Sequence, residues 1–169
     1  MSLTFVVGGA ADVFPGELAR AIEEALRGRF GEAAGAQDEP YHSEPVGVLG
    51  WRRLQERVLR TPDAAPQLTT IDAYQAVYVP DALEQVEHLA VANAADPLQV
   101  GSVPALLEEL QRFAARASLP TDDLELMRLG AHYLEADDPD ADLDVQTYVQ
   151  LMLTARQALA RRQPLWVVV

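Results

Sequence analysis

The densest group of chemically capable side chains in this chain of 169 residues is a run of carboxylates. Residues 121–144 hold nine acidic side chains against one arginine. Asp138, Asp140 and Asp142 match the first three ligand positions of a calcium loop, where hard oxygens at alternate positions converge on one cation. However, Leu143 stands where that loop needs a glycine turn, and Val149 stands where it needs a bidentate glutamate. The pattern excludes an EF-hand, and we expect no metal site.

Two interpretations of the acidic stretch remain. The first is a solvated loop between two helices, whose last acids, Asp142 and Asp144, cap the helix that follows. The second is an electrostatic docking surface for a basic protein partner, presented by Asp137, Asp138 and Asp140. Both agree with the formal net charge of −13, which disfavours binding to nucleic acid or to anionic lipid.

A second candidate site is the pair Gly8 and Gly9, which follows an apolar segment and precedes a helical pattern. Glycine turns and the free amides at the start of a helix can hold an anion. The stretch lacks both the GxGxxG spacing and the P-loop lysine, and Asp12 would place negative charge beside the anion. We therefore expect a tight turn between strand and helix, with a ligand-binding site at Gly8 and Gly9 as the alternative.

The histidines do not form a recognisable catalytic or metal-binding pattern. His42, His88 and His132 are far apart in the sequence, and none belongs to an HExxH motif. His42, Ser43 and Glu44 are the residue types of a catalytic triad, but side chains of adjacent residues diverge. The sequence therefore predicts no catalytic residue.

The amino-acid composition excludes several kinds of chemistry. The chain has no cysteine, which excludes thiolate nucleophiles and cysteine-based zinc or iron–sulfur sites. Its 13 basic residues are all arginine, which excludes Schiff-base catalysis and the P-loop lysine. We expect no cofactor. No apolar run is long enough to span a bilayer and no secretory signal is recognisable, so we expect a cytoplasmic protein, of bacterial type from its composition.

Hydrophobic periodicity predicts the elements that would position these side chains. Strands are expected over 3–7, 73–79 and 165–169, and the first and last are apolar enough to be covered on both faces. Helices are expected over 16–30, 51–59, 103–117 and 143–162, with another opening at residues 120–123 and a less regular one over 83–89. Residues 31–46 read as a long loop. We expect one helix-rich α/β or α+β domain, residues 1–169, with a small mixed sheet that includes both terminal strands.

The function that these observations favour is a non-catalytic role in protein–protein interaction or regulation, through the acidic docking surface. The alternative is a small-molecule-binding protein or enzyme with a nonstandard site near the N-terminal glycine turn.

Overall fold

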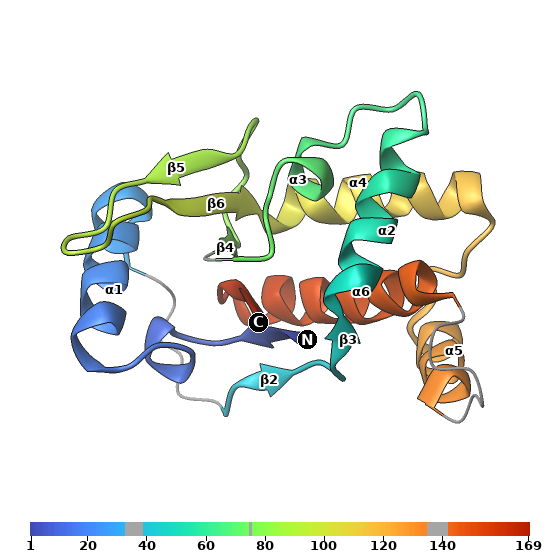
Figure 1. The fold of residues 1–169 in the computed structure, drawn as a ribbon, viewed down its shortest axis with the longest axis horizontal. Helices are drawn as coiled ribbons and strands as arrows, with labels where there is room; N and C mark the ends of the chain where they lie inside the picture. The colour runs from blue at the N-terminus through green and yellow to red at the C-terminus, as the bar shows by residue number, and fades with distance from the viewer. Residues whose placement is uncertain (33–38, 75, 135–141) are drawn as a thin grey trace.

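The computed structural model describes residues 1–32, 39–74, 76–134 and 142–169, in which helices cover both faces of a mixed sheet (Figure 1). The strands are β1 (Ser2–Val7), β2 (Tyr41–His42), β3 (Val46–Gly47), β4 (Ala76–Val79), β5 (Glu87–Leu89), β6 (Leu98–Ser102) and β7 (Leu165–Val168). The helices are the 3₁₀ turn η1 (Ala10–Asp12), α1 (Gly16–Phe30), α2 (Val48–Leu59), α3 (Pro66–Thr69), α4 (Val103–Ala117), α5 (Asp123–Leu134) and α6 (Leu143–Arg161).

The strand order is β2-β1-β7-β4-β6-β5, and β3 also pairs with β1. β7 is antiparallel to both β1 and β4, while β4 and β6 are parallel. β1, β4 and β6 therefore all run in one direction. Their carboxyl ends lie at the edge of the sheet where β7 begins.

Alternation along the central strands builds two apolar layers. On β1, Leu3, Phe5 and Val7 join the large cluster that includes side chains of α2, α4 and α6. Val6 of β1 and Trp166 of β7 face the other way, into a smaller cluster with α1. Figure 1 shows α1 on one side of the sheet and the group of α2, α4 and α6 on the other. The sheet is thus buried on both faces, as continuously apolar strands require.

The crossing of α2 and α6 depends on a glycine. A β-carbon built on Gly50 of α2 would lie 2.7 Å from the Leu143 carbonyl oxygen and 2.5 Å from Thr147 Oγ1 of α6. Only a residue without a side chain allows the two helices to approach this closely. The same α6 also packs against α4 and α5.

The fold class expected from the sequence is confirmed. The structure combines a helical majority with one mixed sheet that contains both the N-terminal and the C-terminal strand. These two strands lie side by side, with Phe5 opposite Val167. Ser102 caps α4, because its hydroxyl oxygen accepts a hydrogen bond from the Ala105 amide at 3.3 Å.

The helix expected over residues 83–89 is wrong. Residues 87–89 form β5, an edge strand antiparallel to β6, with His88 opposite Gln99. Leu83, Val86 and Leu89 are three residues apart, a spacing that favours a helix. An edge strand of only three residues is too short to show the apolar alternation that would have indicated a strand.

Of the loop expected over 31–46, residues 33–38 lie outside the described residues, and the rest includes β2 and the first residue of β3, two short strands paired with β1. Ser43 fixes this segment to the sheet. Its hydroxyl oxygen accepts a hydrogen bond from the Phe5 amide at 3.0 Å, and the hydroxyl donates to the Glu44 carbonyl oxygen at 2.9 Å. Ser43 is thus engaged with the backbone rather than poised as a nucleophile.

Asp142 and Asp144 were expected to cap the start of α6, and the structure gives them other roles. Asp142 occupies the N-cap position with φ +51°, and its side chain makes no capping hydrogen bond. Asp144 instead pairs with Arg57 of α2 at 2.6 Å. Within the described ranges, no helix is both long enough and apolar enough to cross a membrane.

Candidate functional site

Gly8 and Gly9 form the turn at the carboxyl end of β1, and three hydrogen bonds fix it. The Gly8 amide donates to the Pro164 carbonyl oxygen at 3.2 Å, and the Trp166 indole N–H donates to the Gly8 carbonyl oxygen at 2.9 Å. The Gly9 amide donates to the Asp12 carboxylate at 2.8 Å. A β-carbon on Gly8 would lie 2.5 Å from Asp12 Oδ2, so glycine is needed here for the carboxylate to fold back over the turn.

This geometry disfavours the binding of an anion at the glycine turn. A phosphate placed at the Gly9 amide would have to displace the Asp12 carboxylate, which already accepts that hydrogen bond. The turn presents a negative side chain where a phosphate loop presents free N–H groups. Gly9 therefore belongs to the site as part of its wall.

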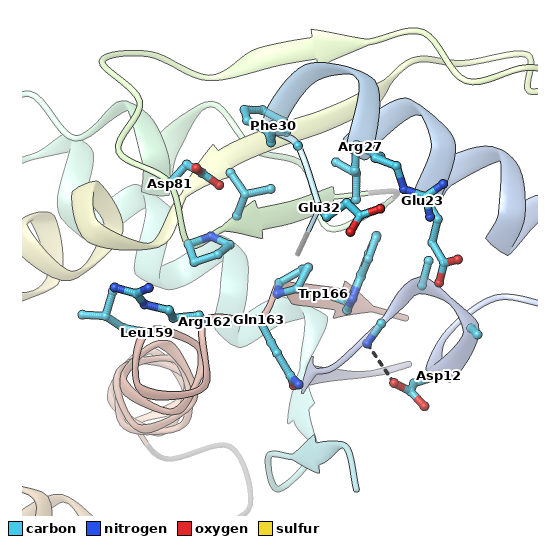
Figure 2. Close-up of a pocket in the computed structure, with 18 residues that line it drawn as sticks. Asp12, Glu23, Arg27, Phe30, Glu32, Asp81, Leu159, Arg162, Gln163 and Trp166 are labelled. Carbon is cyan, nitrogen blue, oxygen red and sulfur yellow. Dashed lines mark hydrogen bonds between the residues drawn. The ribbon is translucent and has the colours of Figure 1, made fainter. Parts of the chain in front are cut away.

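Next to this turn lies a cavity of about 1020 Å³, which we call the β1–β4 cleft (Figure 2). It lies where β1 and β4 end and β7 begins, between the last turns of α1 and the end of α6. Crevices at the carboxyl ends of strands are the common ligand sites of open α/β sheets. The cleft is lined by Gly9, Ala10, Ala11, Asp12, Glu23, Leu26, Arg27, Phe30, Gly31, Glu32, Val79, Pro80, Asp81, Leu159, Arg162, Gln163, Pro164 and Trp166.

The apolar wall of the cleft is held rigidly. Trp166 is buried, with its indole N–H bonded to the backbone and its ring in an edge-on contact with Phe14 at 5.4 Å between centroids. Val79 on the neighbouring strand is also buried. A wall fixed by the sheet in this way needs no reorganisation to accept a ligand, which lowers the entropic cost of binding.

The polar side chains of the cleft carry both signs of charge. Four are carboxylates, Asp12, Glu23, Glu32 and Asp81, and two are guanidinium groups, Arg27 and Arg162. In Figure 2, Glu23 and Arg27 project from α1, while Arg162 lies on the opposite side at the end of α6. Among the described residues, none of these six side chains is joined in an ion pair within 4 Å.

Gln163 lines the cleft but keeps its side-chain oxygen away from it. The residue is only 3% exposed, and its buried side-chain oxygen has no hydrogen-bond partner among the described residues. A buried polar atom without a partner costs free energy, but this oxygen is closed to solvent and is not part of the surface that a ligand would meet. Gln163 was not singled out in the sequence, because its neighbours Arg162 and Pro164 read only as the end of a helix.

A buried polar network lies behind the cleft, on the other side of β4. Both Glu109 carboxylate oxygens accept hydrogen bonds at 2.9 Å, from the Gln67 and Leu68 amides. Tyr78 donates to the Gln67 carbonyl oxygen at 2.7 Å, and the Gln67 side chain accepts from the Ser102 amide at 2.8 Å. The network therefore fixes α3 to β4 and to the start of α4.

Burial raises the pKa of Glu109 to about 7, while the two amide hydrogen bonds oppose that rise. Glu109 was not among the residues predicted to form a site. A signal was present, because Glu109 falls on the same helical face as Leu106, Leu110 and Phe113. A carboxylate within an apolar stripe indicates a buried acid.

A smaller cavity, of about 620 Å³, lies near the opposite ends of the central strands, where β7 finishes. Its wall includes Phe14, Tyr74, His88, Asp96 and Gln99. In the described part of the chain, no three histidine, aspartate or glutamate side chains gather as a metal-binding group. His88 lies on the edge strand β5.

The predicted docking residues Asp137, Asp138 and Asp140 lie outside the described residues. Two neighbouring acids of that stretch have structural roles. Asp122 accepts hydrogen bonds from the Leu124 and Glu125 amides at the start of α5. Asp123 pairs with Arg156 of α6.

Comparison of the chain with protein-family models, with curated proteins and with solved structures returned no match.

Proposed function

We propose that this protein binds a small organic molecule in the β1–β4 cleft. The observation that carries the proposal is the position and chemistry of the cleft. The cleft opens at the carboxyl ends of β1 and β4. It has an apolar wall, and the charged side chains around that wall do not pair with one another. Its volume of about 1020 Å³ is at the upper end of the range for ligand pockets, roughly 300–1,000 Å³.

Charged side chains on a surface usually have no fixed partner, so the unpaired state alone is weak support. The support comes from the convergence of carboxylates and guanidinium groups on one cavity, beside the rigid apolar wall of Val79 and Trp166. The smaller cavity near Tyr74 is lined by Asp72 and Asp96, but by no guanidinium group among the described residues. We therefore assign binding to the larger cleft.

The test is retention of small molecules by the purified protein, measured by native mass spectrometry after incubation with a filtered bacterial metabolite extract. Ala11 is exposed and lines the cleft, so Ala11→Trp should fill it without disturbing the core. Ala131→Trp, on the exposed face of α5, is the matched control.

We expect wild type and Ala131→Trp to retain the same molecule and Ala11→Trp to lose it. Equal retention by all three proteins would place binding elsewhere. No retained molecule in the wild type would overturn the proposal.

The docking of a basic protein partner on Asp137, Asp138 and Asp140 stays a separate prediction, since those residues lie outside the described ranges. It does not compete with the cleft for the same surface residues.

A further inference from the structure

We propose that the charge on Glu109 controls the shape of the β1–β4 cleft at Asp81, through buried hydrogen bonds that pass from α3 to Ser102. The inference rests on the proposed function, because it assigns regulation by pH to the site that would bind a small molecule. Glu109 does not line the cleft itself, so its effect on the cleft depends on the residues between them.

The first link is the attachment of α3 to Glu109. The Gln67 amide donates to one carboxylate oxygen and the Leu68 amide donates to the other, both at 2.9 Å. An ionised carboxylate accepts at both oxygens, whereas a protonated one carries a donor O–H group on one of them. The structure therefore shows the arrangement that suits the charged form. Protonation weakens one of the two amide hydrogen bonds and releases the first turn of α3 from its fixed position.

Gln67 carries a movement of α3 to the sheet. Its side-chain oxygen accepts a hydrogen bond from the Ser102 amide at 2.8 Å, and its carbonyl oxygen accepts one from the Tyr78 hydroxyl at 2.7 Å. All three residues are fully buried. Gly101 leaves no free space beside them, since a β-carbon there would lie 2.6 Å from the Gln67 side-chain oxygen. In a close-packed interior, a displaced side chain moves its neighbours.

Ser102 connects this buried region to the cleft. Its hydroxyl donates to the Asp81 carbonyl oxygen at 2.8 Å, and its backbone lies opposite Val79 where β4 pairs with β6. Val79, Pro80 and Asp81 all line the cleft. A displacement of Ser102 therefore reaches three consecutive residues of the cleft wall.

The surroundings of Glu109 allow both charge states near neutral pH. The residue is 4% exposed. Desolvation raises its pKa to about 7, and the two amide hydrogen bonds from α3 oppose that rise. A change of pH around neutrality therefore changes the charge that holds α3.

The other charged and titratable side chains around this carboxyl group come from α4, β4 and the segment before α3. On α4, Arg112 favours the charged form and Glu108 opposes it. Burial raises the pKa of Tyr78 on β4 well above its ordinary value, so its hydroxyl stays neutral. Asp63 pairs with Arg116. α3 itself, with the sequence Pro-Gln-Leu-Thr, brings no charged side chain.

The experiment follows the ligand-free protein by NMR between about pH 5.5 and pH 8.5, above the ordinary titration of carboxylates. The carbon shift of the Glu109 carboxyl group reports its charge. We expect this carbon and the amides of Leu68, Ser102 and Asp81 to titrate with one common midpoint. Glu109→Gln should abolish the transition at the three amides, and Glu56→Gln, on the exposed face of α2, should keep it. Histidines also titrate in this range, and the loss of the transition in Glu109→Gln distinguishes the two sources.

Ser102→Ala tests the path from α3 to the cleft. It removes the hydroxyl that donates to Asp81 and keeps the amide that donates to Gln67. We expect Leu68 to titrate as in the wild type and the pH-dependent shift of the Asp81 amide to fall by at least half. A full Asp81 transition in Ser102→Ala would overturn the proposal.

The wild type alone also decides, even if Glu109→Gln does not fold. A Glu109 carbon that titrates without any response at Asp81, or that does not titrate in this range, would overturn the proposal.

These outcomes are distinct from those of the retention experiment, because no ligand is present. Coupled titration of Leu68 and Asp81, with no molecule retained from the metabolite extract, would support the coupling and overturn the binding site. A retained molecule without coupled titration would support the cleft as a binding site and overturn its control by Glu109.

Discussion

At the scale of single residues, Glu109 shows how strongly position in the fold changes an acid. The carboxyl group is buried beneath α3, where two backbone amides donate to it. Loss of hydration disfavours the charged form, and this raises the pKa to about 7, from an ordinary value of 4.5. The folded protein therefore binds the Glu109 proton more tightly than the unfolded chain does.

The stability of the protein should depend on pH through this group. The contribution of Glu109 is fully present below about pH 4.5 and is lost as the pH rises through about 7. A rise of this size corresponds to at most about 3.5 kcal/mol, at about 1.4 kcal/mol for each pH unit. Glu109→Gln cannot titrate, so its free energy of unfolding should lack this component.

The measurement is urea unfolding of wild type and Glu109→Gln between pH 5 and pH 8. The wild type should lose about 2–3 kcal/mol relative to the variant over that range. Glu56→Gln, on the exposed face of α2, is the control. A constant difference between wild type and Glu109→Gln at every pH would contradict the buried titration.

The residues of the candidate site differ in how far the sequence revealed them. Gly8, Gly9 and Asp12 stood out because a glycine turn after a strand is a local signal, and Asp12 was recognised as unfavourable for an anion. Glu23, Glu32 and Arg162 were not recognised, since they are exposed or half-buried residues of helices and a loop. What brings them to one cavity is the pairing of β1 with β7, a contact between opposite ends of the chain that no local pattern encodes.

At the scale of secondary-structure elements, the long helices and the two terminal strands were predictable because their periodicity is sustained. α1 and α4 begin and end at the residues expected from the sequence, 16–30 and 103–117. β6 was missed because its sequence, Leu-Gln-Val-Gly-Ser, has a glycine where a strand pattern needs a side chain. Gly101 is required there, since a β-carbon would lie 2.6 Å from the Gln67 side-chain oxygen.

The crossing of α2 and α6 provides a prediction at the same scale. Gly50→Ala should force the two helices apart, because the added carbon would meet the Leu143 carbonyl oxygen at 2.7 Å and backbone cannot rotate away as a side chain can. Overpacking of this kind costs about 1–3 kcal/mol.

Gly28→Ala is the matched control, because nothing lies within 4 Å of a β-carbon at that exposed position of α1. It should stabilise the protein by about 0.5–1 kcal/mol, since alanine loses less backbone entropy in a helix than glycine. Thermal unfolding of the two variants measures both effects. A loss of stability in Gly28→Ala equal to that of Gly50→Ala would argue against a specific helix contact.

At the scale of the whole molecule, the excess of acidic residues is the property with the widest consequences. It gives the surface a field that attracts cations and repels anions. The predicted docking of a basic protein partner depends on this field.

The docking prediction concerns Asp137, Asp138 and Asp140. If a basic protein partner docks there, replacing all three with asparagine should slow association, and the steep fall of the wild-type rate with salt should largely disappear. Glu17→Gln with Glu56→Gln and Glu108→Gln removes the same charge elsewhere and should change the rate less. Stopped-flow association with a basic protein recovered by co-purification measures these rates. Equal rates for wild type and the aspartate variant at low salt would leave the solvated-loop interpretation.

The most direct test of the β1–β4 cleft as a small-molecule site is a screen of water-soluble fragments of all charge classes. Binding is mapped from changes in the amide chemical shifts of a two-dimensional nitrogen–proton spectrum. Ligand sites attract fragments because they combine a concave apolar wall with a few polar groups. We predict that the fragments that bind shift the amides of Gly9, Ala11, Glu32 and Arg162 together, and that Ala11→Trp abolishes these shifts. Shifts concentrated around Tyr74 and His88 at the smaller cavity, or a screen without a binder, would contradict the assignment.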